Sequence, residues 1–412
     1  MSVLVKPIEQ TYKIGDAAFA AIAVSSFFLG RAVVYYIGGV LADSVNRRNL
    51  ILASGIAWSV AAGSIVFAAH PWQLFTARLC GGLTMAVGGA AVASLAMDSF
   101  TRDRRTFAIS LFGVGNSIGV GLGLALCASL LKLADRCTPF LTRYIQDVQA
   151  WQVCFLFNAV LGLMACALLI TVSEPSRLDS VLHEQRSVSG SLRTFITYIR
   201  QHGLLWVGLT AANLLMNTVI SAVNTWQPTL ANRVYHISVA DAAAVLGVVI
   251  TITSIAARLV AGSIAQILIN RSREYLIPVA IAMCPALAVG FVVTFPLVHA
   301  YTLSVVLMAF AIFAESSISM FHFNAVQDTV PNEVRGQIIG VSGLTTFTSQ
   351  LIGSLGFAIV SDHFFGGGAG LRYAFALCSG ICTVLALIAC VLSISRYRIA
   401  RHALAQSLTT VA

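Results

Sequence analysis

The chain has 412 residues, of which 58% are hydrophobic and only 10% are charged, and its mean hydropathy is +0.86. Soluble globular domains carry about 25% charged residues, so this composition excludes an ordinary soluble enzyme, a disordered chain and a disulfide-rich secreted domain. The net charge of +9 does not indicate a nucleic-acid partner, because the basic residues are dispersed among short loops between apolar runs.

Apolar runs long enough to cross a bilayer recur along the whole chain. A hydrocarbon core about 30 Å thick needs about 20 apolar residues per helix. We therefore predict an all-α polytopic membrane protein with eleven spans, at residues 17–42, 50–69, 73–97, 107–132, 152–173, 203–225, 241–268, 276–297, 302–325, 337–360 and 373–395.

The distribution of basic residues predicts the orientation of these spans. The loops on one side carry most of the arginines, including Arg47, Arg48, Arg104 and Arg105. Because positive residues favour the cytoplasmic side, we expect the N-terminus outside, the C-terminus in the cytoplasm, and a multi-pass location in the inner or plasma membrane.

Two pairs of similar sequence features indicate an internal repeat. The segment from Gly39 to Arg48 (GVLADSVNRR) ends the first span, and the segment from Gly262 to Arg271 (GSIAQILINR) ends the seventh with the same G-x-[LI]-A pattern. Arg105 and Arg335 likewise open the fourth and tenth spans. Both pairs lie six spans apart, an even number, so the copies face the same side of the membrane and predict two parallel six-helix halves.

The repeat also predicts a missing helix. In the second half, two spans have passed when the chain reaches the end of the G-x-[LI]-A segment. In the first half, only one span has passed at the corresponding point. We therefore expect eleven of twelve helices, with the first one absent and residues 5–16 forming the outer loop after it; a mis-chosen start codon or a fragment would explain this. The predicted parts are an N-terminal half (residues 1–173), a cytoplasmic linker (174–202), a C-terminal half (203–395) and a cytoplasmic tail (396–412).

Four charged residues stand well inside predicted spans: Arg31, Arg78, Arg258 and Glu315. Charges within a bilayer are costly, so each is a candidate for a functional site. Three cations against one anion make the interior positive, which favours an anionic or zwitterionic substrate. The alternative is that the arginines pair with backbone carbonyls or extend to the interface.

Two polar stripes complete the candidate site. Ser319 and His322 follow Glu315 by four and seven residues, so all three share one helical face that could relay protons. The sixth span carries Asn213, Asn217, Ser221 and Asn224 on an otherwise apolar helix. These side chains line a cavity or form interhelical hydrogen bonds, since an unpaired polar group in hydrocarbon is penalised.

Several motifs resemble the major facilitator superfamily of transporters. The segment from Gly39 to Arg48 is similar to its loop signature, with Asn46 at the usual glycine. Further matches are Arg78-x-x-x-Gly82, Trp151-Gln-x-x-Phe155, Glu174-Pro-Ser-Arg177 and Trp226-Gln-Pro228 with Arg233. The motifs Ala42-Asp43, Asn46-Arg47-Arg48 and Trp58-Ser59 look most like bacterial Spinster-type members.

The chain departs from its relatives at two further positions. Spinster-type relatives often carry a glutamate seven residues after the third-span arginine, where this chain has Met85. The glycine-rich fourth span resembles the antiporter signature but has Val120 in place of its proline. The glycines of that span predict close helix packing.

The resemblance also implies an inner gate formed by Asp43, Arg47, Arg48 and Asp98. In the superfamily this signature is associated with a charge network that stabilises the outward-open state, and a latch worth a few kcal/mol changes which state dominates. The alternative is a topology signal combined with charges at helix ends.

No catalytic motif, nucleotide-binding loop or metal-ligand spacing occurs, so we expect no enzyme activity, no cofactor and no metal. We predict a monomeric secondary active transporter that moves a small organic, anionic or amphiphilic solute by alternating access, coupled to protons. The alternatives are a uniporter or facilitator, a non-transporting sensor or scaffold that keeps the fold, and, third, a membrane-embedded enzyme.

Overall fold

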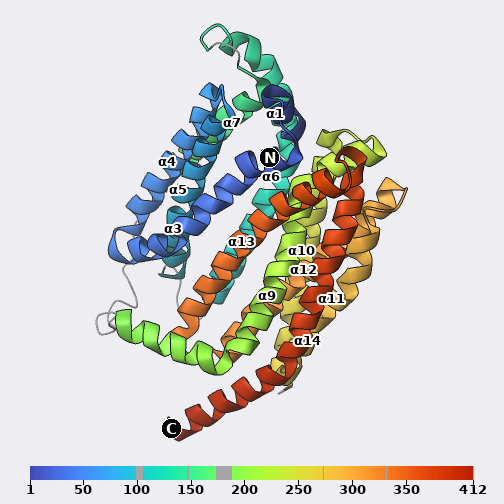
Figure 1. The fold of residues 1–412 in the computed structure, drawn as a ribbon. Coiled ribbons are helices and arrows are strands. Elements are labelled where there is room, and N and C mark those ends of the chain that lie inside the picture. The colour runs from blue at the N-terminus through green and yellow to red at the C-terminus, as the bar shows by residue number, and fades with distance from the viewer. Residues whose placement is uncertain (99–104, 146–147, 173–187, 272, 331, 412) are drawn as a thin grey trace. The chain divides into compact units, whose positions relative to one another are not determined.

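The structure is a computed structural model that describes residues 1–98, 105–145, 148–172, 188–271, 273–330 and 332–411. Within these ranges the chain is helical and contains no strand (Figure 1), which confirms the predicted all-α fold. The elements are α1 (Val5–Tyr12), α2 (Asp16–Phe19), η1 (Ala20–Ser25), α3 (Ser26–Ser44), α4 (Arg47–Ser64), η2 (Ile65–Phe67), α5 (Pro71–Asp98), α6 (Arg105–Leu141), α7 (Ala150–Leu169), α9 (Val188–Tyr235), α10 (Val239–Asn270), η4 (Glu274–Leu276), α11 (Ile277–Thr294), α12 (Tyr301–Thr329), α13 (Asn332–Phe364), η5 (Gly368–Gly370) and α14 (Leu371–Val411).

Nine segments in the described ranges are helical, long and apolar enough to cross a membrane. They are Asp16–Tyr35, Arg47–Phe67, Ala150–Leu169, Ile196–Tyr235, Val239–Leu268, Ile277–Thr294, Tyr301–His322, Val341–Phe364 and Gly368–Tyr397, and each overlaps a predicted span. The other two predicted spans, 73–97 and 107–132, fall within α5 and α6. The total of eleven stays a prediction.

The chain forms two compact units. Unit 1 comprises Met1–Leu178, Asn224–Val248 and Gln350–Leu371, and unit 2 comprises Asp179–Val223, Val249–Ser349 and Arg372–Ala412. Unit 1 therefore combines the N-terminal helices with the ends of α9 and α13 and the start of α10. The predicted division into an N-terminal and a C-terminal half stays a prediction.

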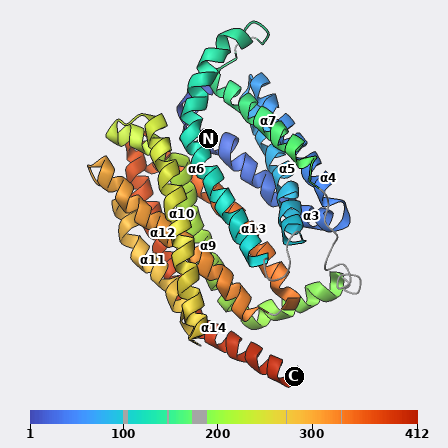
Figure 2. The same ribbon diagram turned by 180° about the vertical axis from the view of Figure 1, so that it is seen from behind.

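The close packing of α3 on α5 depends on two glycines. α3 packs along α5, and α4 packs against both α5 and α7 (Figures 1 and 2). A Cβ atom on Gly30 would lie 2.3 Å from the carbonyl oxygen of Leu79, and one on Gly82 would lie 2.0 Å from that of Phe27. The backbones of α3 and α5 approach this closely because both positions lack a side chain.

The glycines of the fourth predicted span behave differently. At Gly115, Gly119 and Gly123 a Cβ atom would meet no described atom within 4 Å. The close packing expected of these three residues is therefore not found among the described residues, whereas Gly162 of α7 has a close neighbour, since a Cβ atom there would lie 2.4 Å from the hydroxyl of Ser59.

Unit 2 has one large apolar core built from α9 to α14. Its buried members include Trp206 of α9, Ile281 of α11, Phe321 of α12 and Tyr397 of α14. α11 runs alongside α12 in both views (Figures 1 and 2). This core fixes the three helices that carry the polar groups of unit 2.

Segments expected to be loops contain helix. The predicted outer loop over residues 5–16 holds α1, whose side chains Val5 and Ile8 are buried. Lys13 ends this helix in the left-handed conformation (φ 52°), and its N–H donates to the carbonyl of Glu9. Of the predicted linker, residues 174–187 lie outside the described ranges, and the remainder belongs to α9; the predicted tail continues α14 as far as Val411.

The first span is interrupted by a π-helical segment, Ala20–Ser25, between α2 and α3. π-helical turns occur mostly as single-turn bulges within α-helices, frequently at functional sites. The carbonyl of Ala23, inside this segment, accepts a hydrogen bond from Arg78 of α5 at 2.8 Å. The irregular segment is therefore tied to one of the candidate arginines.

Replacing Gly82 with alanine should weaken the packing of α3 on α5. The new Cβ would overlap the Phe27 carbonyl, and such overpacking costs about 1–3 kcal/mol. Gly89→Ala is the matched control, because it lies on the same helix and its Cβ would meet no described atom within 4 Å. Thermal unfolding in detergent should show a lower midpoint for Gly82→Ala alone; equal midpoints would contradict the packing assignment.

Candidate functional site

A buried polar cluster lies in unit 2, where α9, α10 and α12 meet. The Ser319 hydroxyl lies 3.5 Å from Glu315 Oε1 and 3.3 Å from Asn213 Oδ1, so its single proton can be donated to either oxygen. The Ser316 hydroxyl lies 3.3 Å from Glu315 Oε2 and 3.2 Å from the hydroxyl of Ser254. Each carboxylate oxygen of Glu315 thus faces a serine hydroxyl.

The amide stripe of α9 continues this cluster. The side-chain nitrogen of Asn217 donates to the Asn213 backbone carbonyl at 2.8 Å and to its Oδ1 at 3.1 Å. Ser221, one turn further on, is fully buried. The stripe therefore faces protein, as expected for polar groups on an apolar helix.

Arg258 supplies the cation of this site. It lies on α10 one turn after Ser254, and its positive charge acts on the Glu315 carboxylate. The structure thus brings Arg258, Glu315, Asn213 and Ser319 together around one carboxyl group. Burial favours the neutral form of Glu315, whereas the charge of Arg258 favours the carboxylate, so movement of Arg258 would change the proton affinity of this group.

His322 is directed elsewhere. Its Nε2 lies 3.2 Å from the hydroxyl of Ser342 on α13, and its ring meets the Trp206 ring edge to face at 6.3 Å between centroids. No contact between His322 and Glu315 is present among the described residues. The proposed relay along one face of α12 is therefore continuous only from Glu315 to Ser319.

Two members of the cluster were not identified from the sequence. Ser254 precedes Arg258 by four residues and so shares its helical face, and Ser316 adjoins Glu315. The spacing of Ser254 from Arg258 was the available signal. Serine, however, is common in membrane helices, where its hydroxyl can bond to its own backbone.

Arg78, on α5, is a candidate arginine of unit 1. Its Nε donates to the Ala23 carbonyl at 2.8 Å, and its guanidinium carbon lies 4.4 Å from the centroid of the Phe27 ring. Pairing with a backbone carbonyl was the alternative interpretation of this residue. The contact occupies Nε and leaves the planar group at the edge of a cavity.

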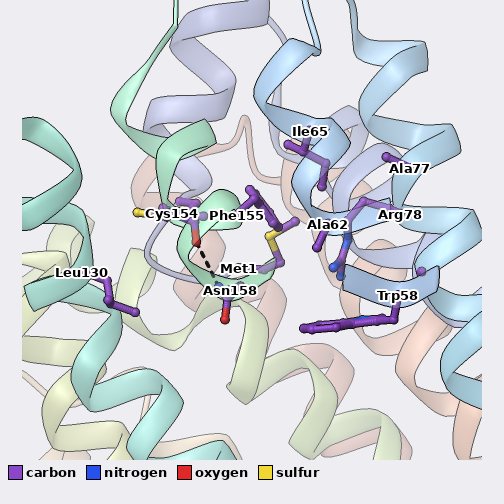
Figure 3. A pocket seen from close by; sticks show the side chains of 12 residues that line it. Met1, Trp58, Ala62, Ile65, Ala77, Arg78, Leu130, Cys154, Phe155 and Asn158 are labelled. Atoms are coloured by element: carbon purple, nitrogen blue, oxygen red, sulfur yellow. Dashed lines mark hydrogen bonds between the residues drawn. The ribbon is translucent and has the colours of Figure 1, made fainter. Parts of the chain in front are cut away.

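That cavity measures about 250 Å³, and its lining combines apolar side chains with those of Arg78 and Asn158. Figure 3 shows Trp58 and Arg78 on one side of it and Cys154, Phe155 and Asn158 on another. Asn158 donates to the carbonyl of Cys154 at 3.2 Å. Such a lining can contact both the apolar and the polar parts of a ligand.

The remaining candidate residues are placed as follows. Arg31, on α3, interacts electrostatically with Tyr35 one turn along the same helix. Arg47 is buried, with 1% of its surface exposed, and a terminal nitrogen of Arg48 donates to the carbonyl of Ile170 at 2.5 Å. The side chains of Asp43 and Asp98 lie outside what the structure describes. The four-residue gate thus stays a prediction.

Comparisons with known proteins place the chain in one family. The family model described as the Major Facilitator Superfamily matches residues 1–357. A chloroplastic probable anion transporter of Oryza sativa subsp. japonica is 25% identical over 59% of this chain and 47% of its own length. A human voltage-gated purine nucleotide uniporter is 25% identical over 81% of this chain and 74% of its own length.

A solved structure shows the same fold. The crystal structure of a bacterial homologue of the human lysosomal transporter Spinster, inward-facing and unoccupied, superimposes with a TM-score of 0.77 at 18% identity. The match covers 97% of this chain and 92% of that one. The region matched in the rice anion transporter is about half of that protein's length.

Exchanging Arg78 for lysine should destabilise unit 1 without changing its charge. A lysine ammonium cannot both donate from the Nε position and stack on Phe27, and losing a hydrogen bond from a charged donor costs about 1.5–3 kcal/mol. Arg136→Lys, at an exposed position of α6, is the control. Thermal unfolding should show a lower midpoint for Arg78→Lys alone, and unchanged midpoints for both variants would refute this role.

Proposed function

The chain belongs to the Major Facilitator Superfamily, and from this premise we propose that it is a secondary active transporter that works by alternating access and is coupled to protons. Membership of the family makes it a multi-pass membrane transporter rather than an enzyme. We propose a small organic solute of anionic or amphiphilic character as its substrate.

The observation that carries this proposal is the buried carboxyl group of Glu315. Its oxygens face Ser316 and Ser319, and Arg258 supplies a positive charge. A carboxyl group held in this way can exchange a proton when a ligand or a helix movement displaces Arg258. Coupling needs such a group within the membrane, and Glu315 is buried in a candidate span.

The charge balance of the spans supports an anionic substrate. Arg31, Arg78 and Arg258 lie well inside the predicted spans, where Glu315 is the acidic candidate. Asn213, Asn217 and Ser221 add hydrogen-bonding groups on α9. The names of the rice anion transporter and the human purine nucleotide uniporter also point to negatively charged solutes.

The gate and the cellular context are part of the same proposal. Asp43, Arg47, Arg48 and Asp98 would form the inner latch, and His322 would assist proton movement beside Ser342. The protein would act as a monomer in the inner or plasma membrane with its C-terminus in the cytoplasm. Its partners would be lipid, the solute and protons.

A uniporter is the second candidate, and the name of the human purine nucleotide uniporter favours it. A uniporter moves solute down its own gradient and needs no titrating carboxyl group. The two candidates therefore differ in their dependence on Glu315. A sensor that keeps the fold would bind solute without any exchange across the membrane.

Glu315→Gln should abolish proton-driven accumulation but leave solute exchange intact. The amide keeps the hydrogen bonds to both serines but cannot bind or release a proton. Substrates are first sought by thermal stabilisation with anions and their neutral counterparts, for example ADP with adenosine. Uptake of a stabilising anion into proteoliposomes is then measured with and without an imposed pH gradient.

Asp241→Asn, an exposed acid at the start of α10, is the control and should accumulate solute as the wild type does. Accumulation by Glu315→Gln at the wild-type level would exclude this residue from coupling. Wild-type uptake that does not depend on the pH gradient would favour the uniporter. Stabilisation only by neutral compounds would refute the anionic substrate.

A further inference from the structure

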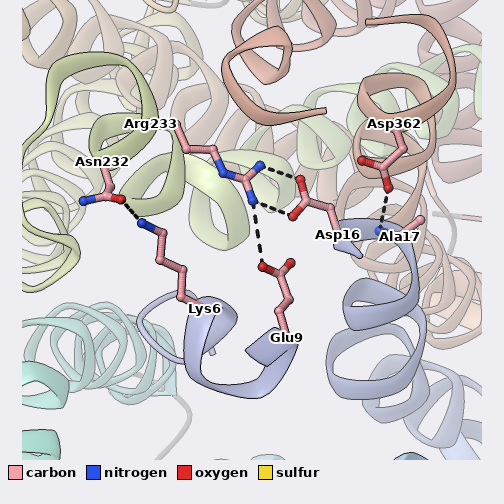
Figure 4. A network of polar contacts seen from close by, with 7 residues as sticks. All are labelled: Lys6, Glu9, Asp16, Ala17, Asn232, Arg233 and Asp362. Carbon is pink, nitrogen blue, oxygen red and sulfur yellow. Dashed lines mark hydrogen bonds and ion pairs between the residues drawn. The ribbon is translucent and has the colours of Figure 1, made fainter. Parts of the chain in front are cut away.

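A second charge cluster, within unit 1, joins α1 and the start of α2 to the ends of α9 and α13 (Figure 4). Arg233, near the end of α9, donates from its two terminal nitrogens to the Asp16 carboxylate, at 2.5 and 2.7 Å. The same guanidinium lies 3.9 Å from Oε2 of Glu9. Asp362 of α13 accepts a hydrogen bond from the backbone N–H of Ala17 at 3.1 Å.

The acidic groups of this cluster outnumber its cations. Glu9, Asp16 and Asp362 face the single guanidinium of Arg233, since Lys6 donates to the side-chain oxygen of Asn232 instead. Oε1 of Glu9 is buried and lacks a hydrogen-bond donor among the described residues. A buried carboxylate oxygen without a donor is penalised, whereas a protonated carboxyl group can donate to the carboxylate beside it.

The surroundings of Glu9 favour its protonated form. Burial raises the pKa of Glu9 to about 8, and the adjacent Asp16 carboxyl and the charge of Asp362 act in the same direction against Arg233. Tyr12, on the same helix, stays neutral because burial raises its pKa to about 12. At neutral pH the pair therefore holds one proton, and its single negative charge is matched by Arg233.

The last turn of α1 is also fixed to the N-terminal helices. The Tyr12 hydroxyl donates to the carbonyl of Ala68 at 2.9 Å, and the Trp151 indole donates to the hydroxyl of Thr11 at 3.0 Å. α1 is thus anchored to the segment after η2 and to α7, and its contacts with α9 are those of Glu9 with Arg233 and of Lys6 with Asn232. Breaking these contacts would separate parts of the chain that lie far apart in sequence.

We propose that Glu9 and Asp16 form a carboxyl pair that binds one proton and, together with Arg233, acts as a latch that holds α1 and the start of α2 to the end of α9. With the proton bound, the pair and Arg233 are balanced in charge. Loss of the proton leaves two adjacent carboxylates against one arginine, and their repulsion and hydration open the contact. The latch extends the proposed transport function, because alternating access requires such contacts to open, but its test needs no substrate.

The direction of the pH effect follows from linkage. In the open state Glu9 faces water, and its pKa returns toward the ordinary value of 4.5. Between that value and about 8 the closed state binds more protons than the open state. Closure is therefore favoured as the pH falls and lost as the pH rises, by up to about tenfold per pH unit within this interval.

Hydrogen exchange of the backbone amides of α1 tests the latch in the full-length protein in nanodiscs. After correction for the intrinsic pH dependence of exchange, the wild-type amides should open progressively more as the pH is raised from about 6 to 9. Glu9→Gln keeps a neutral donor beside Asp16, so its α1 should remain protected at every pH. Asp16→Asn loses the charge that Arg233 binds and should be unprotected throughout.

Asp135→Asn, an exposed acid of α6, is the control and should follow the wild type. The latch is refuted if wild-type protection does not change with pH, or if Glu9→Gln shows the same pH dependence as the wild type. Infrared difference spectra of Glu315→Gln, which lacks the proton-exchanging carboxyl group proposed for α12, give a second measurement that leaves the latch residues unchanged. A protonated carboxyl band should disappear with a midpoint near 8, and a band that titrates below 6 would also overturn the proposal.

Discussion

Hydrocarbon offers no hydrogen bonds, so every polar group within a span of this chain needs a partner inside the protein. Helices meet this requirement for the backbone, which explains why the described chain is helical throughout. For side chains the same requirement directs Arg78 to the Ala23 carbonyl and surrounds Glu315 with Ser316 and Ser319. The polar residues that form these hydrogen bonds are also the ones that could instead bind a solute or a proton.

The sequence predicted the positions of the spans well, because each needs only a long apolar run. The predicted span 276–297 corresponds to Ile277–Thr294, and 241–268 lies within Val239–Leu268. Spacing along one helix was similarly reliable, since Ser319 contacts Glu315 one turn away. These features depend on helical geometry alone, which sequence spacing determines.

Contacts between distant segments could not be predicted in this way. Arg233 and Asp16 are 217 residues apart, and nothing in the local pattern of either indicates the other. Residues 5–16 were expected to form an outer loop because the repeat places them after a missing first helix, yet burial of Val5 and Ile8 supports α1. Close packing was expected at the glycines of α6 but occurs at Gly30 and Gly82, because tertiary placement decides which glycines meet a neighbouring backbone.

The π-helical segment Ala20–Ser25 separates Asp16 from Arg31 within the first span. A π turn closes its hydrogen bond one residue later than an α turn. The residues after the segment are therefore shifted by one residue relative to a continuous α-helix. An α-helix advances about 100° per residue. Returning the segment to α-helical register would therefore rotate the side chains after it by about that angle, and Arg31 would face a different neighbour while Asp16 remained paired with Arg233.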